Sequence, residues 1–133
     1  MKNTVKTLLA TMITVFLFSS VYAQTSDAYF ILHKTNDKIF SQSSNGEKTV
    51  VFEIAGLSTK EEVDALVTKM KTLRGVVSVT LEETSADGKW KAAAVFYKYA
   101  NKQYFPQFFK WCGIQTIEID NIKYDTQNIE ITE

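Results

Sequence analysis

The chain of 133 residues has few of the residues that cross-link small folds or end their helices and strands. It contains one cysteine, one proline and five glycines. A single cysteine cannot form an internal disulfide, so packing alone must hold the fold together, also in an oxidising compartment. The chain also has a single histidine, so few pairs of a catalytic histidine with a nucleophile are possible.

Charge of one sign and a long apolar run are missing as well. The chain has 15 basic and 15 acidic residues, whereas nucleic-acid and anionic-membrane surfaces need a clustered cationic footprint. The apolar run from about Leu8 to Leu17 is about half as long as the roughly 20 residues that a membrane-spanning helix needs. We therefore expect no nucleic-acid partner and no stable membrane insertion.

Residues 1–23 have the three parts of an export signal. These are a basic head with Lys2 and Lys6, the apolar run, and a small-residue ending at Ala23. Gln24 stands where lipid-anchored export would need a cysteine. The sequence predicts cleavage after Ala23 and a soluble periplasmic or secreted product. Without Lys2 and Lys6, its 110 residues include 13 basic and 15 acidic ones, which suits one domain with a formal charge of −2.

Two segments flank the predicted domain at residues 49–120. Residues 24–48 join a short apolar stretch to a polar run that ends at Gly46, and we interpret them as an N-terminal arm and linker. Residues 121–133 form a C-terminal tail in which Ile129 and Ile131 alternate, as they would in an added edge strand.

The first half of the domain has strand and helix signals. Apolar residues alternate from residue 50 to residue 54, as in a strand, and Gly56 ends the pattern. Thr59 with Glu62, or the pair one residue earlier, fits a helix capping box. Gly75 stands at a C-terminal cap position of the helix that follows. The apolar residues at helical spacing are Val63, Leu66, Val67, Met70 and Leu73.

The second half repeats the pattern with a hairpin and a shorter helix. Two strands are expected around residues 77–81 and 90–97, joined by a turn at 85–88. Pro106 suits the first turn of a helix that ends at Gly113, and a last strand follows at 117–119. The order β-α-β-β-α-β predicts an α+β, ferredoxin-like sandwich. In it, two helices cover one face of a four-stranded antiparallel sheet, to which a terminal extension could add an edge strand.

Short motifs at the predicted turns are similar to those of a known family. They are Gly-Leu-Ser-Thr at 56–59, the helix ending Leu-Arg-Gly-Val-Val-Ser-Val-Thr-Leu-Glu at 73–82, and Trp-Cys-Gly-Ile at 111–114. In these motifs and in the hairpin, residues 49–119 resemble the heavy-metal-associated (HMA) domain of copper chaperones and metal-transporting ATPases. The resemblance covers about 70 of the 110 mature residues and implies the ferredoxin-like fold.

The resemblance does not extend to the family's metal site. The family holds a soft cation such as Cu(I) between two cysteines in a C-x-x-C motif at this turn, because such metals prefer thiolate ligands. The matching positions here are Thr59 and Glu62, and Lys60 adds positive charge beside them. We therefore expect no metal at the turn and no other cofactor.

Cys112 and His33 are the fallback metal ligands, and each has a structural alternative. Cys112 falls on the apolar side of the second helix, where a free cysteine behaves as a small buried side chain. His33 stands alone in the N-terminal segment, as a surface histidine would. Because this one cysteine and one histidine lie far apart in sequence, we expect no catalytic residue and no enzyme.

The sheet face that the helices leave uncovered is a candidate interaction surface. If Phe52 and Val95 belong to the core face, the two-residue period of strands sends their neighbours to the opposite face. We expect an exposed apolar strip there, covered by the chain's own extensions, by a partner protein or by a second copy. The predicted strip comprises Val51, Ala55, Trp90, Ala92, Ala94 and Phe96.

Taken together, these observations predict an exported, non-enzymatic binding or interaction module with an HMA-like fold that lacks the cysteine pair for soft-metal binding. Its expected partner is an unidentified protein or a second copy, bound at the uncovered sheet face. Two alternatives stay open at this point. One is metal handling through non-standard ligands, and the other is an enzyme of unrecognised type.

Overall fold

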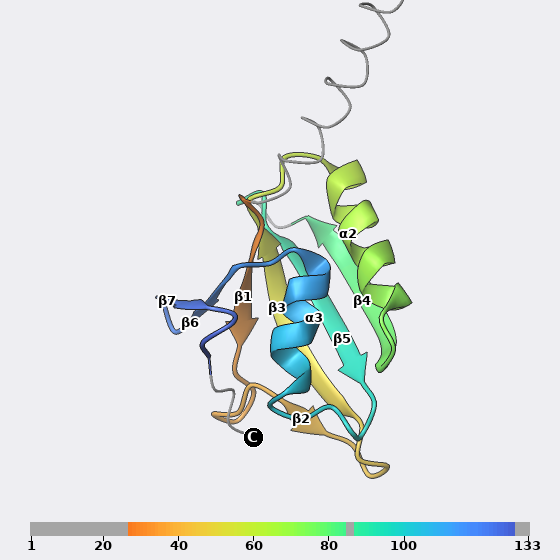
Figure 1. Ribbon diagram of the computed structural model, residues 1–133. Coiled ribbons are helices and arrows are strands. Elements are labelled where there is room, and N and C mark those ends of the chain that lie inside the picture. Colours follow the sequence, from red (N-terminus) through yellow and green to blue (C-terminus); the bar gives the residue numbers. More distant parts are fainter. Residues whose placement is uncertain (1–26, 85–86, 130–133) are drawn as a thin grey trace, which may run out of the picture.

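The computed structural model describes residues 27–84 and 87–129, and the predicted signal peptide lies outside this part (Figure 1). Seven strands and two helices form a mixed α+β fold there, which confirms the predicted class. They are β1 (Tyr29–His33), β2 (Ser41–Gln42), β3 (Lys48–Ala55), α2 (Lys60–Thr72), β4 (Val76–Thr84), β5 (Trp90–Phe96), α3 (Tyr104–Cys112), β6 (Thr116–Ile119) and β7 (Ile122–Asp125). Neither α2 nor α3 is long and apolar enough to cross a membrane.

All strands belong to one sheet in the order β4-β5-β3-β1-β6-β7, with β2 paired to β3. Neighbours are antiparallel except for β1 and β6, which are parallel. The predicted four-stranded antiparallel sheet is therefore wrong in strand number and in direction. Its four strands are present as β3, β4, β5 and β6, but β1 lies between β3 and β6.

β1 belongs to the segment expected to be an N-terminal arm, but it is an internal strand of the sheet. Phe30 and Leu32 point to one face and are 1% and 5% exposed. The backbone of β1 pairs with β3 on one side and with β6 on the other. A short stretch with one apolar face and both edges hydrogen-bonded is a central strand, which is why residues 28–32 do not form a loose arm.

The C-terminal tail supplies the edge strand at a different place from the one expected. β7 pairs with β6 through a tight turn at Asp120 and Asn121, whose φ angles are 53° and 66°. Aspartate and asparagine adopt this left-handed conformation more readily than other residues with a side chain. Ile129 packs against the core outside any strand, and Ile131 lies outside the described residues.

α2 begins as predicted but ends earlier. Thr59 is its N-cap, and the helix ends because the backbone of Leu73 is extended (φ −76°, ψ 133°). Gly75 is therefore not the C-cap. It has a φ of 100° and lies so close to Tyr97 that an added Cβ would be 2.6 Å from the Tyr97 Cε1 atom.

α3 follows its prediction closely. Pro106 lies in the first turn, and Gly113 ends the helix in the left-handed conformation with a φ of 73°. The backbone N–H groups of Gly113 and Ile114 donate hydrogen bonds to the carbonyl oxygens of Lys110 and Phe109. These bonds satisfy carbonyl groups that the end of a helix otherwise leaves unpaired.

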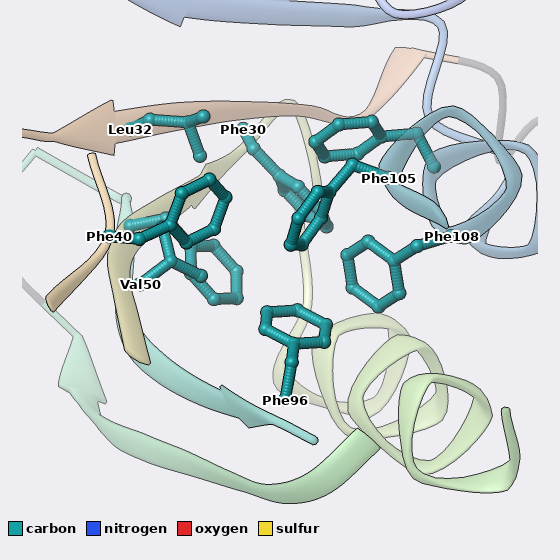
Figure 2. A pocket seen from close by; sticks show the side chains of 9 residues that line it. Phe30, Leu32, Phe40, Val50, Phe96, Phe105 and Phe108 are labelled. Atoms are coloured by element: carbon teal, nitrogen blue, oxygen red, sulfur yellow. The ribbon is translucent and has the colours of Figure 1, made fainter. Parts of the chain in front are cut away.

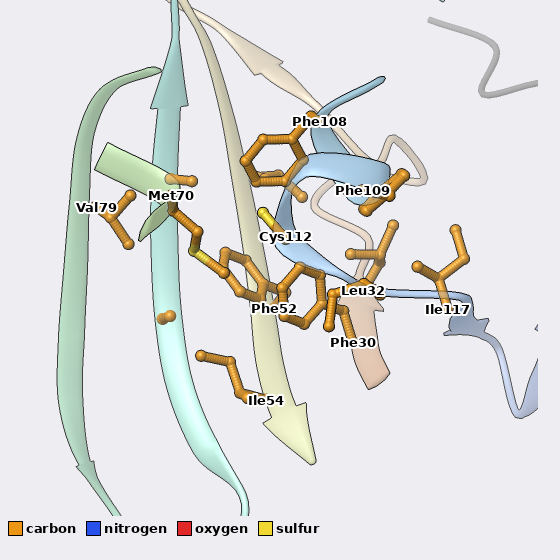
Figure 3. Close-up of a cluster of buried hydrophobic side chains, with 14 of the residues drawn as sticks. Phe30, Leu32, Phe52, Ile54, Met70, Val79, Phe108, Phe109, Cys112 and Ile117 are labelled. Carbon is orange, nitrogen blue, oxygen red and sulfur yellow. The ribbon is translucent and has the colours of Figure 1, made fainter. Parts of the chain in front are cut away.

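Both helices cover the same face of the sheet, and the core lies between the two layers (Figures 1 and 3). Aromatic rings form much of it: the Phe96 ring centroid lies 5.2 Å from that of Phe105 and 5.0 Å from that of Phe108, both in edge-to-face geometry. The buried helix residues are Val63, Val67, Met70, Phe105, Phe108, Phe109 and Cys112, and those of the sheet are Phe30, Leu32, Val50, Phe52, Ile54, Val79, Ala92, Ala94, Phe96, Ile117 and Ile119.

Candidate functional site

Four of the six residues of the predicted apolar strip lie on the covered face of the sheet. β5 pairs with β3 so that Ala94 is opposite Val50 and Ala92 is opposite Phe52, and directly opposite residues share a face. Ala92 and Ala94 are 2% and 0% exposed. The prediction is therefore wrong for Trp90, Ala92, Ala94 and Phe96, which face the helices.

The error lies in the face assigned to β5. Val95 is expected on the core face, yet it lies opposite Thr49 on the open face. Side chains from the helices fill the space above β5, so small residues such as Ala92 and Ala94 fit beneath them. Val51 and Ala55 do lie on the open face, where Val51 is partly buried and Ala55 is 4% exposed.

The open face is mixed: apolar side chains such as Ile31, Val51 and Val95 lie among opposite charges on neighbouring strands. Glu53 lies opposite Lys91 in the β3–β5 register, and its Oε2 atom is 3.3 Å from Nε2 of His33. Glu118 and Lys123 are opposite each other on β6 and β7. Opposite-charge pairs of this kind stabilise a sheet surface in contact with water. The six-residue strip predicted from the sequence does not form on this face, because four of its members lie on the covered side.

The turn before α2 uses its polar side chains to cap the helix. The backbone N–H of Glu62 donates to Oγ1 of Thr59 over 3.3 Å, and the backbone N–H of Ser58 donates to Oε2 of Glu62 over 3.0 Å. Of the two capping pairs that the sequence allows, the structure therefore has the pair of Thr59 and Glu62. Thr59 and Glu62 thus bind backbone groups of the chain itself.

The two fallback metal ligands lie on opposite sides of the sheet. His33 pairs with Glu53 on the open face, and its side chain is 45% exposed. Cys112 is 7% exposed on the helix side, and burial raises the pKa of its thiol to about 12, although Lys69 opposes this shift. Metals bind the thiolate rather than the thiol. Within residues 27–84 and 87–129, no three His, Cys, Asp or Glu side chains are grouped as a metal site would require.

A groove of about 440 Å³ lies beside this turn, between one side of α2, the residue that leads into β1, and the end of α3. Its volume is in the range of small-ligand sites. Gly56 allows two segments to approach closely here, because an added Cβ would lie 2.2 Å from the Asp27 carbonyl oxygen. The groove is lined by Ala28, Leu57, Glu61, Glu62, Ala65, Leu66, Lys69 and Cys112.

The groove has an apolar floor and charged ends. Glu61 and Glu62 stand in the first turn of α2 and Lys69 in its last turn, all on the side of the helix that also carries the groove residues Ala65 and Leu66. The sequence predicted only the capping role of Glu62 and the buried position of Cys112. It gave no sign of the rest, because the groove forms between segments that are distant in sequence.

Lys69 is positioned by a contact with α3. Its Nζ atom lies 5.9 Å from the centroid of the Trp111 ring, and the Trp111 indole N–H donates to the backbone carbonyl oxygen of Lys69 over 3.1 Å. A cation above a tryptophan face is attracted to the ring. The ammonium group is therefore held near the Cys112 end of the groove.

A second hollow, inside the core, is too small to be a site. It has a volume of about 10 Å³ and is enclosed mainly by phenylalanine rings, among them Phe40, which stacks on Phe105 with a centroid distance of 4.5 Å (Figure 2). A water molecule needs about 10–15 Å³ together with polar partners. Since the lining is apolar, this hollow is a packing gap.

Two further hollows have mixed linings and bury polar groups that tie loops together. In one, of about 350 Å³, the Lys48 ammonium group donates to the backbone carbonyl oxygen of Ala100. In the other, of about 420 Å³, the Thr126 hydroxyl donates to the carbonyl oxygen of Ile114. These bonds connect loops and strand ends, and they have a structural role.

Comparisons with family models, with curated proteins and with solved structures found no match to the chain.

Proposed function

We propose that the protein is an exported, non-enzymatic binding module that holds its ligand in the groove between α2 and the end of α3. The observation that carries this proposal is the combination of an apolar floor of suitable volume with charged side chains at the two ends. Sites for small ligands are concave and mostly apolar, with a few polar groups that orient the ligand.

The absence of enzyme activity is part of this proposal. His33 and Cys112, the side chains best suited to act as base and nucleophile, are separated by the sheet. The raised pKa of the Cys112 thiol, about 12, keeps it protonated near neutral pH, and a thiol is a much weaker nucleophile than a thiolate. No observation favours metal handling over the binding of an organic ligand.

We further propose that the unit from β3 to β6 is a ferredoxin-like, HMA-related domain into which β1 has been inserted. Its element order β3-α2-β4-β5-α3-β6 supports this relation. The groove adjoins the turn that holds the metal in the family. The same corner of the fold would then bind an organic ligand in place of a cation, since its thiolates are replaced by capping groups.

The binding proposal can be tested with N-phenyl-1-naphthylamine, a neutral apolar dye that fluoresces more strongly in apolar surroundings. We expect the mature protein to bind it and Ala65→Phe, which fills the exposed side of the groove, to weaken binding at least about tenfold. Ala93→Phe is the matched control on the open face and should leave binding unchanged. If the dye does not bind, or binds equally to both variants, the groove is not a binding site.

A further inference from the structure

The charges around the groove indicate more about its ligand, and this inference rests on the proposed function. α2 carries Glu61 and Glu62 at one end of the groove and Lys69 at the other. A helix dipole alone places about half a positive charge at the N-terminus and half a negative charge at the C-terminus. The two carboxylates and the ammonium group outweigh these partial charges, so the groove has a negative end at the start of α2 and a positive end near Cys112.

The length of the groove follows from the helix that forms its wall. Lys69 comes seven residues after Glu62 and eight after Glu61, which corresponds to a separation of about 10–12 Å along the helix axis. An extended peptide advances about 3.3 Å per residue, so three or four residues span this distance. The charged termini of such a peptide then reach the groove ends of opposite sign.

The floor of the groove determines the side chains that such a peptide can present. The rest of the lining is apolar: it consists of Ala28, Leu57, Ala65 and Leu66, with the buried thiol of Cys112 near the positive end. A leucine-sized apolar side chain in the middle of the peptide would cover this floor and remove it from water. A charged side chain there would lose its hydration without gaining a partner.

We propose that the groove binds a short extended peptide of three or four residues with a free N-terminus at Glu61 and Glu62, an apolar central side chain, and a free C-terminal carboxylate at Lys69.

The probe for this proposal is the tripeptide Ala-Leu-Ala, with N-acetylated and C-amidated forms as single-charge deletions. We expect the free tripeptide to bind, and each cap to weaken binding by about two- to fivefold at low salt, as loss of one exposed ion pair does. The effect should shrink at high ionic strength, because salt screens exposed charges. Titration calorimetry gives the three affinities.

Matched variants assign each charge to its end of the groove. Glu61→Gln with Glu62→Gln should abolish the effect of N-acetylation and keep that of amidation, and Lys69→Gln should do the reverse. Lys91→Gln and Glu118→Gln on the open face serve as controls that should change neither effect. A reversed assignment, or cap effects that persist in all variants, would overturn the proposed orientation and with it the peptide proposal.

The outcomes separate this inference from the proposed function. If the dye binds in the groove but the free tripeptide does not, or if all three peptide forms bind equally, the groove takes an apolar ligand without peptide termini and the inference fails alone. If neither dye nor peptide binds, the proposed function fails too.

Discussion

At the scale of single residues, Gly56 is the position where the structure depends most directly on the absence of a side chain. Its φ is 84°, and an added Cβ would lie 2.2 Å from the Asp27 carbonyl oxygen and 3.2 Å from the Ala28 Cα atom. Both neighbours are backbone atoms, which cannot rotate away. Gly56→Ala should therefore destabilise the fold by about 3 kcal/mol or more, measured by urea unfolding.

Gly88→Ala is the matched control for this prediction. Gly88 also has a positive φ, 72°, but no heavy atom lies within 4 Å of an added Cβ. Its substitution should cost only the conformational strain, about 1 kcal/mol. Equal losses in the two variants would mean that Ala28 does not pack against the end of β3 and that the groove lacks one of its walls.

Capping and turn residues were the most predictable features at this scale. Gly113 ends α3 as the sequence predicts, and Thr59 caps α2 in one of the two pairs that the sequence allows, because a cap depends on residues three or four positions apart. The C-cap predicted at Gly75 is wrong, since α2 ends at Leu73. The role of Gly56 was predicted only in part. The sequence indicated the end of a strand there, but the close approach of Asp27 depends on a pairing between β1 and β3 that local patterns do not specify.

At the scale of elements, β5 provides a direct test of the corrected register. Ala94 is fully buried under the helices and Ala93 lies on the open face. Ala94→Arg would place an unpaired charge in the core and should destabilise the fold by at least about 3 kcal/mol. Ala93→Arg should change stability by no more than about 0.5 kcal/mol and leave the oligomeric state unchanged. Urea unfolding and light scattering measure the two quantities, and the opposite ranking would restore the strip predicted from sequence.

The elements themselves were more predictable than their arrangement. α2, α3 and the strands β3, β5 and β6 follow from alternation, helical spacing and turn residues, all of which are local signals. β1 could not be placed from sequence, because a five-residue apolar stretch fits an arm that covers a sheet as well as a strand within it. Its position was decided by pairing with β3 and β6, which are distant in sequence.

At the scale of the whole molecule, the candidate site is a product of the corrected topology. Insertion of β1 between β3 and β6 brings Ala28, the residue before β1, beside α2 and the end of α3. A four-stranded sheet without β1 would lack this wall. The groove was therefore as unpredictable from sequence as the position of β1, although the residues of α2 that line it follow ordinary helical spacing.

The stability of the whole molecule should decrease in alkali because of Cys112. Burial raises the pKa of its thiol from 9.0 to about 12 in the folded state, so only the unfolded chain releases the proton between these values. The stabilising effect is complete below pH 9 and is lost as the pH rises towards 12. Linkage gives a loss of about 1.4 kcal/mol between pH 8 and pH 10. Urea unfolding of the reduced protein at a series of pH values measures this loss.

Cys112→Ala distinguishes the effect of the thiol on the pH dependence of stability from the effects of other groups that titrate in the same range. The variant should be less stable at pH 8, because it loses a buried side chain, but its stability should fall less steeply up to pH 10. The window ends there because burial also raises the pKa of Tyr104, from 10.0 to about 12, so this hydroxyl destabilises the fold at higher pH in both proteins. Parallel pH profiles for the two proteins would mean that the thiol ionises as easily in the folded state as in the unfolded chain. Cys112 would then be open to water at the floor of the groove, and the apolar site proposed there would not exist.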